Sequence, residues 1–175
     1  MLKSAPRVAA AATLFAITLS SAALAQGTDS PIGTAGDWTA FSANNPKECW
    51  AVSAPKETRN TDSNGNAKEV TRGDIRLYVA YRPGQSGEVS FTGGYPFAPD
   101  SAVELNIGGQ NFKLFTEGES AWAASPSEDT KIVSALRAGS SAIVTGRSAR
   151  GTVTKDTFSL SGITAMTNKA QESCK

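Results

Sequence analysis

The chain has 175 residues, with 17 Lys and Arg, 16 Asp and Glu, and no His. The absence of histidine excludes the Ser-His and Cys-His nucleophile pairs and the usual zinc ligand set, so an enzyme would have to use carboxylates, lysine or tyrosine. The near balance of charge gives no electrostatic case for nucleic acid or an anionic membrane surface as partner.

Residues 1–25 have the pattern of a cleavable secretory signal peptide. Lys3 and Arg7 precede an apolar run over residues 8–19, and the Ala-Leu-Ala of residues 23–25 fits the small-x-small cleavage rule. The run is too short to cross about 30 Å of hydrocarbon, so we expect no membrane span. Cleavage leaves 15 basic and 16 acidic residues, a net charge of 15 − 16 = −1. We therefore predict an exported protein.

Residues 26–36 contain Gly, Ser, Thr and Pro and little to bury, so we expect a flexible arm. The remaining 37–175 are the size of a single domain. Its first two strands are predicted over 38–41 and 49–52, joined by a turn at Asn-Asn-Pro. Residues 54–71 are polar and charged and are predicted to be a solvated loop.

In the middle of the domain, alternating apolar residues predict β-strands. Residues 75–82 alternate as a half-buried strand, and a partner strand starting near Val89 completes a hairpin. The Pro- and Gly-rich stretch 93–100 is predicted to be a compact loop that exposes Tyr95 and Phe97.

A second hairpin can be registered residue by residue if Gly108-Gly109 forms its two-residue turn. Leu105 then faces Phe112 on the core side, and Glu104 faces Lys113 on the solvent side. The apolar pattern, the glycine turn and the opposite-charge pair all predict the same register.

A helix is predicted between Ser125, as its N-cap before Pro126, and Gly139. Strands follow over 142–149 and 153–160, and a terminal helix over 163–173. Many short strands with only one or two short helices indicate an all-β fold, an antiparallel β-sandwich.

The two cysteines, Cys49 and Cys174, both lie in the exported part of the chain, where a thiol pair tends to oxidise. We predict a disulfide between them. A redox-active pair is the alternative, although the spacing is not C-x-x-C.

Aromatic and basic residues near turns are the candidate partner-binding surface: Tyr95, Phe97, Arg147 and Arg150. The two arginines could bind an anion, form an ion pair with Asp156, or remain solvated. Three tryptophans could form a carbohydrate or peptide platform, but at least two are expected in the core; they are Trp38, Trp50 and Trp122.

The tripeptide Arg72-Gly73-Asp74 matches an integrin-binding motif, but it adjoins a buried strand. We interpret Gly73 as a turn residue and Asp74 as the start of that strand.

The ordered set of short motifs along the exported chain resembles the invasion-associated locus B family. The motifs are Trp38, Glu48-Cys49-Trp50, Arg72-Gly73-Asp74-Ile75, Tyr81-Arg82-Pro83, Gly93-Gly94-Tyr95-Pro96-Phe97, Phe112-Lys113-Leu114-Phe115, Arg150-Gly151-Thr152, Asp156-Thr157-Phe158-Ser159-Leu160 and Cys174. The resemblance implies an Ig-like β-sandwich, a periplasmic or outer-membrane-associated location in alphaproteobacteria, and a role in host-cell invasion in pathogens. No catalytic motif belongs to the family. The prototype carries more cysteines than this chain, so a housekeeping envelope role fits equally well.

The sequence thus predicts a non-enzymatic, monomeric envelope protein that binds an unknown protein or cell-surface partner and needs no metal or other cofactor. Two alternatives stay open. A hydrolase of cell-wall glycan or peptide would use carboxylates such as Glu117 and Glu119. A small-ligand carrier would need an apolar pocket between the sheets.

Overall fold

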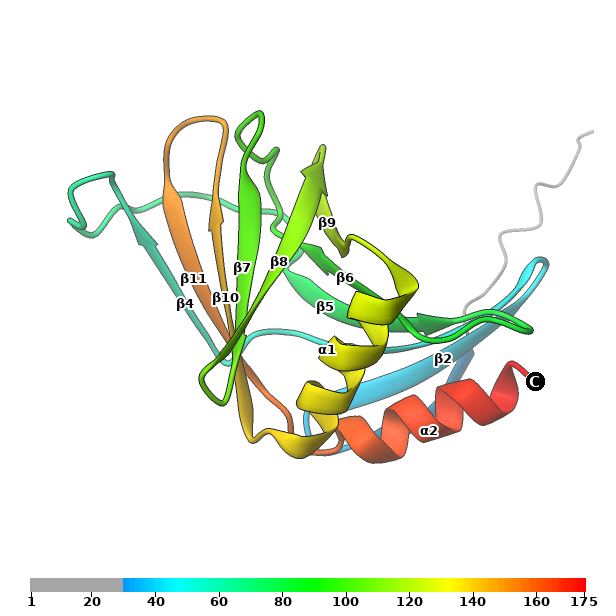
Figure 1. The fold of residues 1–175 in the computed structure, drawn as a ribbon. Coiled ribbons are helices and arrows are strands. Elements are labelled where there is room, and N and C mark those ends of the chain that lie inside the picture. The colour runs from blue at the N-terminus through cyan, green and yellow to red at the C-terminus, as the bar shows by residue number, and fades with distance from the viewer. Residues whose placement is uncertain (1–29) are drawn as a thin grey trace, which may run out of the picture.

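The computed structural model describes residues 30–175, so the predicted signal peptide and the first residues of the arm lie outside the described part of the chain (Figure 1). The elements in this part are β1 (Ser30–Ala35), β2 (Trp38–Asn44), β3 (Lys47–Ser53), β4 (Glu57–Thr61), β5 (Arg76–Tyr81), β6 (Glu88–Thr92), β7 (Ala102–Ile107), β8 (Gln110–Glu117), β9 (Ser120–Ala123), α1 (Pro126–Ala138), β10 (Ser141–Arg147), β11 (Val153–Ser159) and α2 (Ile163–Ser173).

The strands belong to one antiparallel sheet with the order β1-β2-β3-β5-β6-β9-β8-β7-β10-β11-β4. This sheet is bent, and β2, β3, β5 and β6 cross the opposite half at a wide angle (Figure 1). Phe91 of β6 and Phe158 of β11 meet edge to face with ring centroids 6.2 Å apart, although five strand spacings of about 5 Å each separate them along the sheet. The antiparallel all-β class with two short helices is confirmed, and the two layers are halves of one continuous sheet.

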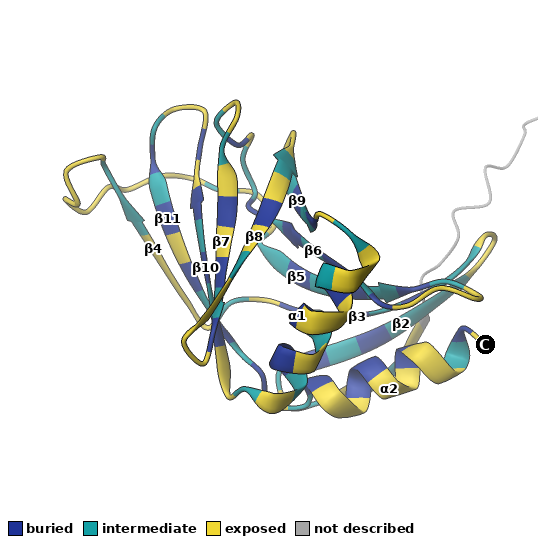
Figure 2. Ribbon diagram, in the orientation of Figure 1, coloured by how far each residue is buried: buried dark blue, intermediate teal, exposed yellow. Residues whose placement is uncertain are grey.

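The core lies between the two halves (Figure 2). In β5 the predicted alternation is confirmed, because Leu77, Val79 and Tyr81 are buried and the residues between them are half-buried. Trp38 is fully buried and donates a hydrogen bond from Nε1 to the carbonyl of Ser159 at 2.9 Å. That bond joins β2 to β11 across the core.

The second predicted hairpin is confirmed in its register. Leu105 pairs with Phe112 and Glu104 with Lys113 across the β7–β8 ladder. Gly108 and Gly109 have φ values of 56° and 88°, a backbone region that glycine adopts at low cost.

Both helices also form where the sequence predicts them. The Ser125 side chain accepts a hydrogen bond from the backbone N–H of Glu128, and the helix ends before Gly139. α2 packs on β1, β2 and β3, with Ile163, Met166 and Ala170 among its buried residues. The helix therefore covers the inner face of one half of the sheet.

Two segments expected to lack regular structure are strands, so these two expectations are wrong. β1 occupies most of the predicted arm and pairs with β2, and β4 lies in the predicted loop and pairs with β11. Both are edge strands held by backbone hydrogen bonds, and β4, Glu-Thr-Arg-Asn-Thr, carries no apolar alternation. Charged, polar side chains are common at sheet edges because they discourage pairing with another chain.

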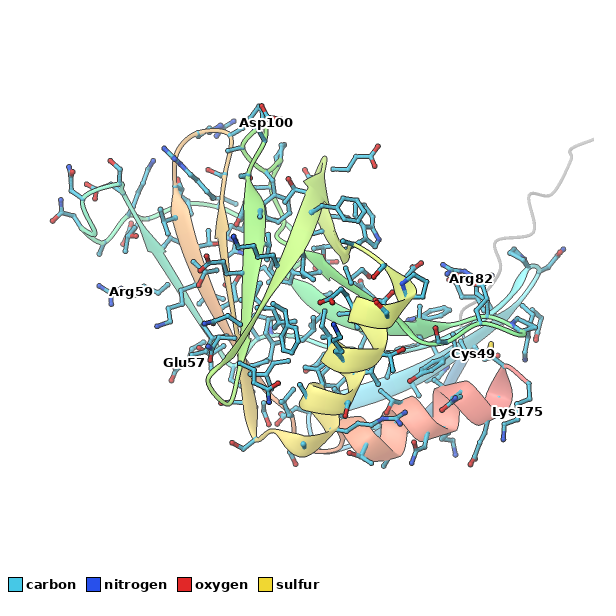
Figure 3. The ribbon with its side chains drawn as sticks, viewed as in Figure 1. Cys49, Glu57, Arg59, Arg82, Asp100 and Lys175 are labelled. Carbon is cyan, nitrogen blue, oxygen red and sulfur yellow. A yellow bond between two sulfur atoms is a disulfide. The ribbon has the colours of Figure 1, made fainter. Side chains whose placement is uncertain are left out.

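The predicted disulfide joins Cys49 of β3 to Cys174 directly after α2, with Cα atoms 5.8 Å apart. Figure 3 shows Cys49 close to the end of α2, near the C-terminal Lys175. Both cysteines are buried. The bond fixes the terminal helix on the sheet.

Candidate functional site

Four chain segments border a cavity of about 260 Å³, here called the loop-end pocket. They are the segment before β5, the β6–β7 loop, the β8–β9 turn and the β10–β11 turn with the start of β11. The lining residues are Val70, Thr71, Arg72, Gly94, Tyr95, Pro96, Glu119, Ser148, Ala149, Arg150, Thr152 and Thr154.

A buried ion pair supports the floor of the pocket, where Arg72 is a lining residue and Asp156 lies behind it. The Nη1 and Nη2 atoms of Arg72 each donate to one carboxylate oxygen of Asp156 at 2.7 Å. The two side chains are 6% and 0% exposed. Arg72 also donates from Nε to the carbonyl of Gly93 at 2.9 Å. Burial raises the pKa of the Asp156 carboxyl, and the Arg72 guanidinium opposes that rise.

Tyr95 lies against this ion pair. The guanidinium carbon of Arg72 is 5.0 Å from the centroid of the Tyr95 ring, a cation–π contact. The Tyr95 and Thr154 hydroxyls share a hydrogen bond, and burial raises the pKa of the Tyr95 phenol. The pocket floor is therefore a hydrogen-bonded, pre-organised surface.

Gly94 lets the loop of Tyr95 approach the segment that carries Arg72. The N–H of Gly73 donates to the carbonyl of Gly94 at 2.8 Å, and a Cβ on Gly94 would lie 2.6 Å from the carbonyl oxygen of Gly73. Gly94 has φ +70°. Only glycine suits both the backbone angle and the close approach. Adjacent glycines at 93 and 94 are the sequence signal that could have revealed this contact.

The expectation that Phe97 is exposed is wrong. Its side chain is 7% exposed, and its ring packs on Phe91 and Tyr95. Tyr95 is half-buried and is held by Arg72 and Thr154. The proline-containing loop is folded inward because its aromatic residues complete the core.

The two arginines predicted to belong to the partner-binding surface lie in different surroundings. Both are exposed, but Arg150 lines the pocket and Arg147, at the end of β10, does not. Neither pairs with Asp156, which instead binds Arg72. Of the Arg72-Gly73-Asp74 tripeptide, only Arg72 lines the pocket, and its guanidinium is bound to Asp156.

The carboxylates considered for hydrolysis do not converge in the pocket. Glu117 and Glu119 are both exposed at the β8–β9 turn, and only Glu119 lines the pocket. The nearby Asp156 carboxylate is bound by Arg72. Within residues 30–175, no three His, Cys, Asp or Glu side chains gather as a metal-ligand group.

The three tryptophans occupy different environments. Trp38 is fully buried, but Trp50 and Trp122 are half-buried on the outward side of the sheet. Trp50 stacks on Phe41 and Trp122 stacks on Phe115. The expectation that at least two tryptophans lie in the core is therefore wrong.

Comparisons with known proteins agree with the fold. The crystal structure of invasion associated protein B from Bartonella henselae superposes with a TM-score of 0.53 at 16% sequence identity, covering 79% of this chain and 94% of that one. This likeness shows a common fold. No curated protein sequence gives a match.

A sequence profile of the invasion associated locus B (IalB) protein family matches residues 38–171. The chain belongs to this family. The match begins at the buried Trp38 and ends within α2, so it includes every residue that lines the loop-end pocket of this IalB protein. Within residues 30–175, neither helix has the length and apolar character required to cross a membrane.

Proposed function

We propose that this IalB protein is an exported, non-enzymatic binding module of the bacterial envelope. It engages a protein or cell-surface partner through the loop-end pocket. The observation that carries the proposal is a pocket with a fixed floor and a charged rim, on which Arg150 and Glu119 are exposed. Rigid floors favour binding because little conformational entropy is lost when a partner docks.

The chemistry of the pocket supports binding over catalysis. The Arg72 guanidinium and the Asp156 carboxylate bind each other, and the Tyr95 hydroxyl is shared with Thr154. Hydrolysis of a glycan by paired carboxylates requires two acids facing each other across the substrate, whereas Glu119 is the single acid lining this pocket. A small-ligand carrier would need its cavity between the halves of the sheet, where buried aromatic side chains pack instead.

Export is supported by two features that are independent of each other. The first 25 residues fit the rule for a cleavable signal, and the disulfide suits an oxidising compartment such as the periplasm. The partner then belongs to the envelope or to a surface that the envelope meets, either a host cell or another cell-wall component. We propose that the protein acts as a monomer.

The test is photo-crosslinking in the living source bacterium, with a photoreactive residue at Arg150 and, as matched control, at Arg147. Both positions are exposed and lie near the same end of β10, but only Arg150 lines the pocket. We expect one discrete adduct from position 150 and none from position 147. The exported fraction should carry Gln26 as its N-terminus, measured by mass spectrometry.

Two results would contradict the proposal. Equal adducts from positions 147 and 150, or none from either, would remove the pocket as the binding site. Retention of residues 1–25 in a cytoplasmic protein would remove the envelope location.

A second crosslinking experiment tests the role of the Arg150 side chain itself. Arg150→Glu should abolish the adduct made from a photoreactive residue at Pro96, which lines the same pocket.

A further inference from the structure

The outward side of the sheet carries aromatic residues that the loop-end pocket does not use. Phe41 pairs with Trp50 across β2 and β3, and Trp122 pairs with Phe115 across β9 and β8. Tyr78 pairs with Ser90, which in turn pairs with Trp122. Directly paired residues share one face of a sheet. These five aromatic residues therefore form one surface, here called the aromatic face: Phe41, Trp50, Tyr78, Phe115 and Trp122.

The rings of the aromatic face are held in place by each other. The ring centroids of Phe41 and Trp50 are 5.6 Å apart, and those of Phe115 and Trp122 are 5.7 Å apart; both pairs are stacked. Phe115 is nevertheless 49% exposed. The face extends from β2 to β8, five strand spacings or about 24 Å along the sheet. It is long enough to contact several units of a polymer.

Two hollows indent this face. One, of about 260 Å³, is lined by Trp50, Tyr78 and the side chains around them, and the other, of about 420 Å³, is lined by Trp122, Phe115 and the start of α1. Glu88 lines both hollows. The two hollows are therefore neighbours along one band of the surface.

Carboxylates are the main polar groups in the two hollows of the aromatic face. Arg82, which directly follows β5 and is labelled in Figure 3, binds Glu48 at 2.6 Å and Glu88 at 3.2 Å. Glu117 and Asp129 line the second hollow. Four carboxyl groups against one guanidinium disfavour an anionic polymer such as nucleic acid or an acidic polysaccharide.

The composition of the band favours a sugar over a protein. Leu, Ile and Met are absent from both sets of lining residues, whereas aromatic rings alternate there with carboxylates and Ser90. The buried centre of a protein interface is more apolar and less charged than this. A pyranose ring instead offers a flat C–H surface that stacks on an aromatic ring and hydroxyl groups that donate to carboxylates.

We infer that the aromatic face binds a neutral, extended, β-1,4-linked glycan chain. In such a chain the ring substituents are equatorial, so each sugar presents flat C–H surfaces that can pack against Trp50 and Trp122 where they line the two hollows. The hydroxyls between them reach Glu48, Glu88 and Ser90. The two hollows of the aromatic face share no lining residue with the loop-end pocket, and this site does not depend on it.

The test is titration calorimetry of the purified chain from Gln26 onwards with two probes, N-acetylchitohexaose and cellohexaose. Trp50→Ala and Trp122→Ala should each weaken binding of the preferred probe by about tenfold or more, the equivalent of one or more stacking contacts. Arg150→Glu, in the loop-end pocket, should leave affinity unchanged. This control separates failure of the glycan site from failure of the proposed function.

A third variant covers the case in which a tryptophan substitution impairs folding. Ser90 lies between Tyr78 and Trp122 on the face, and Ser90→Arg should block the platform while leaving every aromatic side chain in place. The inference is overturned if neither probe binds, or if Ser90→Arg binds as well as wild type. It is also overturned if sedimentation shows a dimer that Ser90→Arg dissociates, because the face would then be an interface between copies of the chain.

Discussion

Two opposite ends of the molecule, one at the disulfide and one at the loop-end pocket, are stabilised by different interactions. At one end, a covalent bond joins Cys49 to Cys174, 125 residues away. At the other end, Arg72 and Asp156, 84 residues apart, are joined by two hydrogen bonds of 2.7 Å. A disulfide stabilises mainly by restricting the unfolded chain. A buried ion pair stabilises only while both partners are present, and it sets the local geometry. The disulfide end thus supplies stability, whereas the ion-pair end supplies the shape of a site.

Breaking the covalent end should have the largest effect on stability. For Cys49→Ala with Cys174→Ala, the chain-entropy model gives a loss of about 5 kcal/mol for a loop of this length. Urea unfolding of the variant and of wild type measures the difference. The crosslink from position 150 should persist under conditions where the variant is folded. Loss of that crosslink in the folded variant would mean that the two ends are coupled.

Breaking the ion-pair end should cost slightly less stability but disrupt the pocket. Asp156→Ala leaves the Arg72 guanidinium buried without its partner, a change that typically costs about 3–5 kcal/mol. The paired apolar replacement Arg72→Met with Asp156→Leu should recover most of this loss. Urea unfolding of the three proteins provides the comparison. A loss below about 1 kcal/mol for Asp156→Ala would place this pair among ordinary surface ion pairs.

The two ends also differ in how far the sequence predicts them. Two cysteines allow one intramolecular pairing, so the disulfide follows from a count once export to an oxidising compartment is predicted. Arg72 is one of 17 basic residues, and no local pattern selects its partner. A signal was nevertheless present in β11, where Thr154, Asp156 and Phe158 alternate inward. An acid in the inward phase of a strand requires a buried cation or hydrogen-bond donor.

Hairpins and helices were predictable because their signals are local. Gly108-Gly109 and the Ser125 cap each act within a few residues. β4 was not predictable, because it pairs with β11 through its backbone and its side chains are polar. The burial of Phe97 was missed for a related reason. The inward turn of its loop depends on the contact between Gly94 and Gly73, which lie far apart in sequence.

A smaller change at the ion-pair end sharpens the distinction between floor and rim. Tyr95→Phe keeps the ring beneath Arg72 and removes the hydroxyl that bonds Thr154. One hydrogen bond contributes about 1 kcal/mol on average, so the free energy of unfolding should fall by that amount. Thermal or urea unfolding measures it. The exposed rim substitution Arg150→Glu should change stability by less than about 0.5 kcal/mol. A larger loss for Arg150→Glu than for Tyr95→Phe would reverse the assignment of floor and rim.

The smallest effect is expected between the two ends, where α1 is joined to β6 by a single charged group. The Asp129 carboxylate accepts a hydrogen bond from the N–H of Val89 at 2.7 Å. Burial raises the pKa of Asp129 above 3.8, and the bond from Val89 only partly offsets that rise. The folded state therefore binds this proton more tightly than the unfolded state does. Stability from this carboxyl is fully present below pH 3.8 and is lost as the pH rises through the folded pKa.

Asp129→Asn isolates this contribution, because the amide oxygen can still accept from Val89 and does not titrate. The free energy of unfolding of the variant minus that of wild type should therefore increase from pH 3 to pH 7, as measured by urea unfolding at several pH values. Asp129→Ala, which removes the acceptor, should be less stable than Asp129→Asn at every pH. A difference that decreases with pH would mean that the helix N-terminus stabilises the charged form more than burial opposes it.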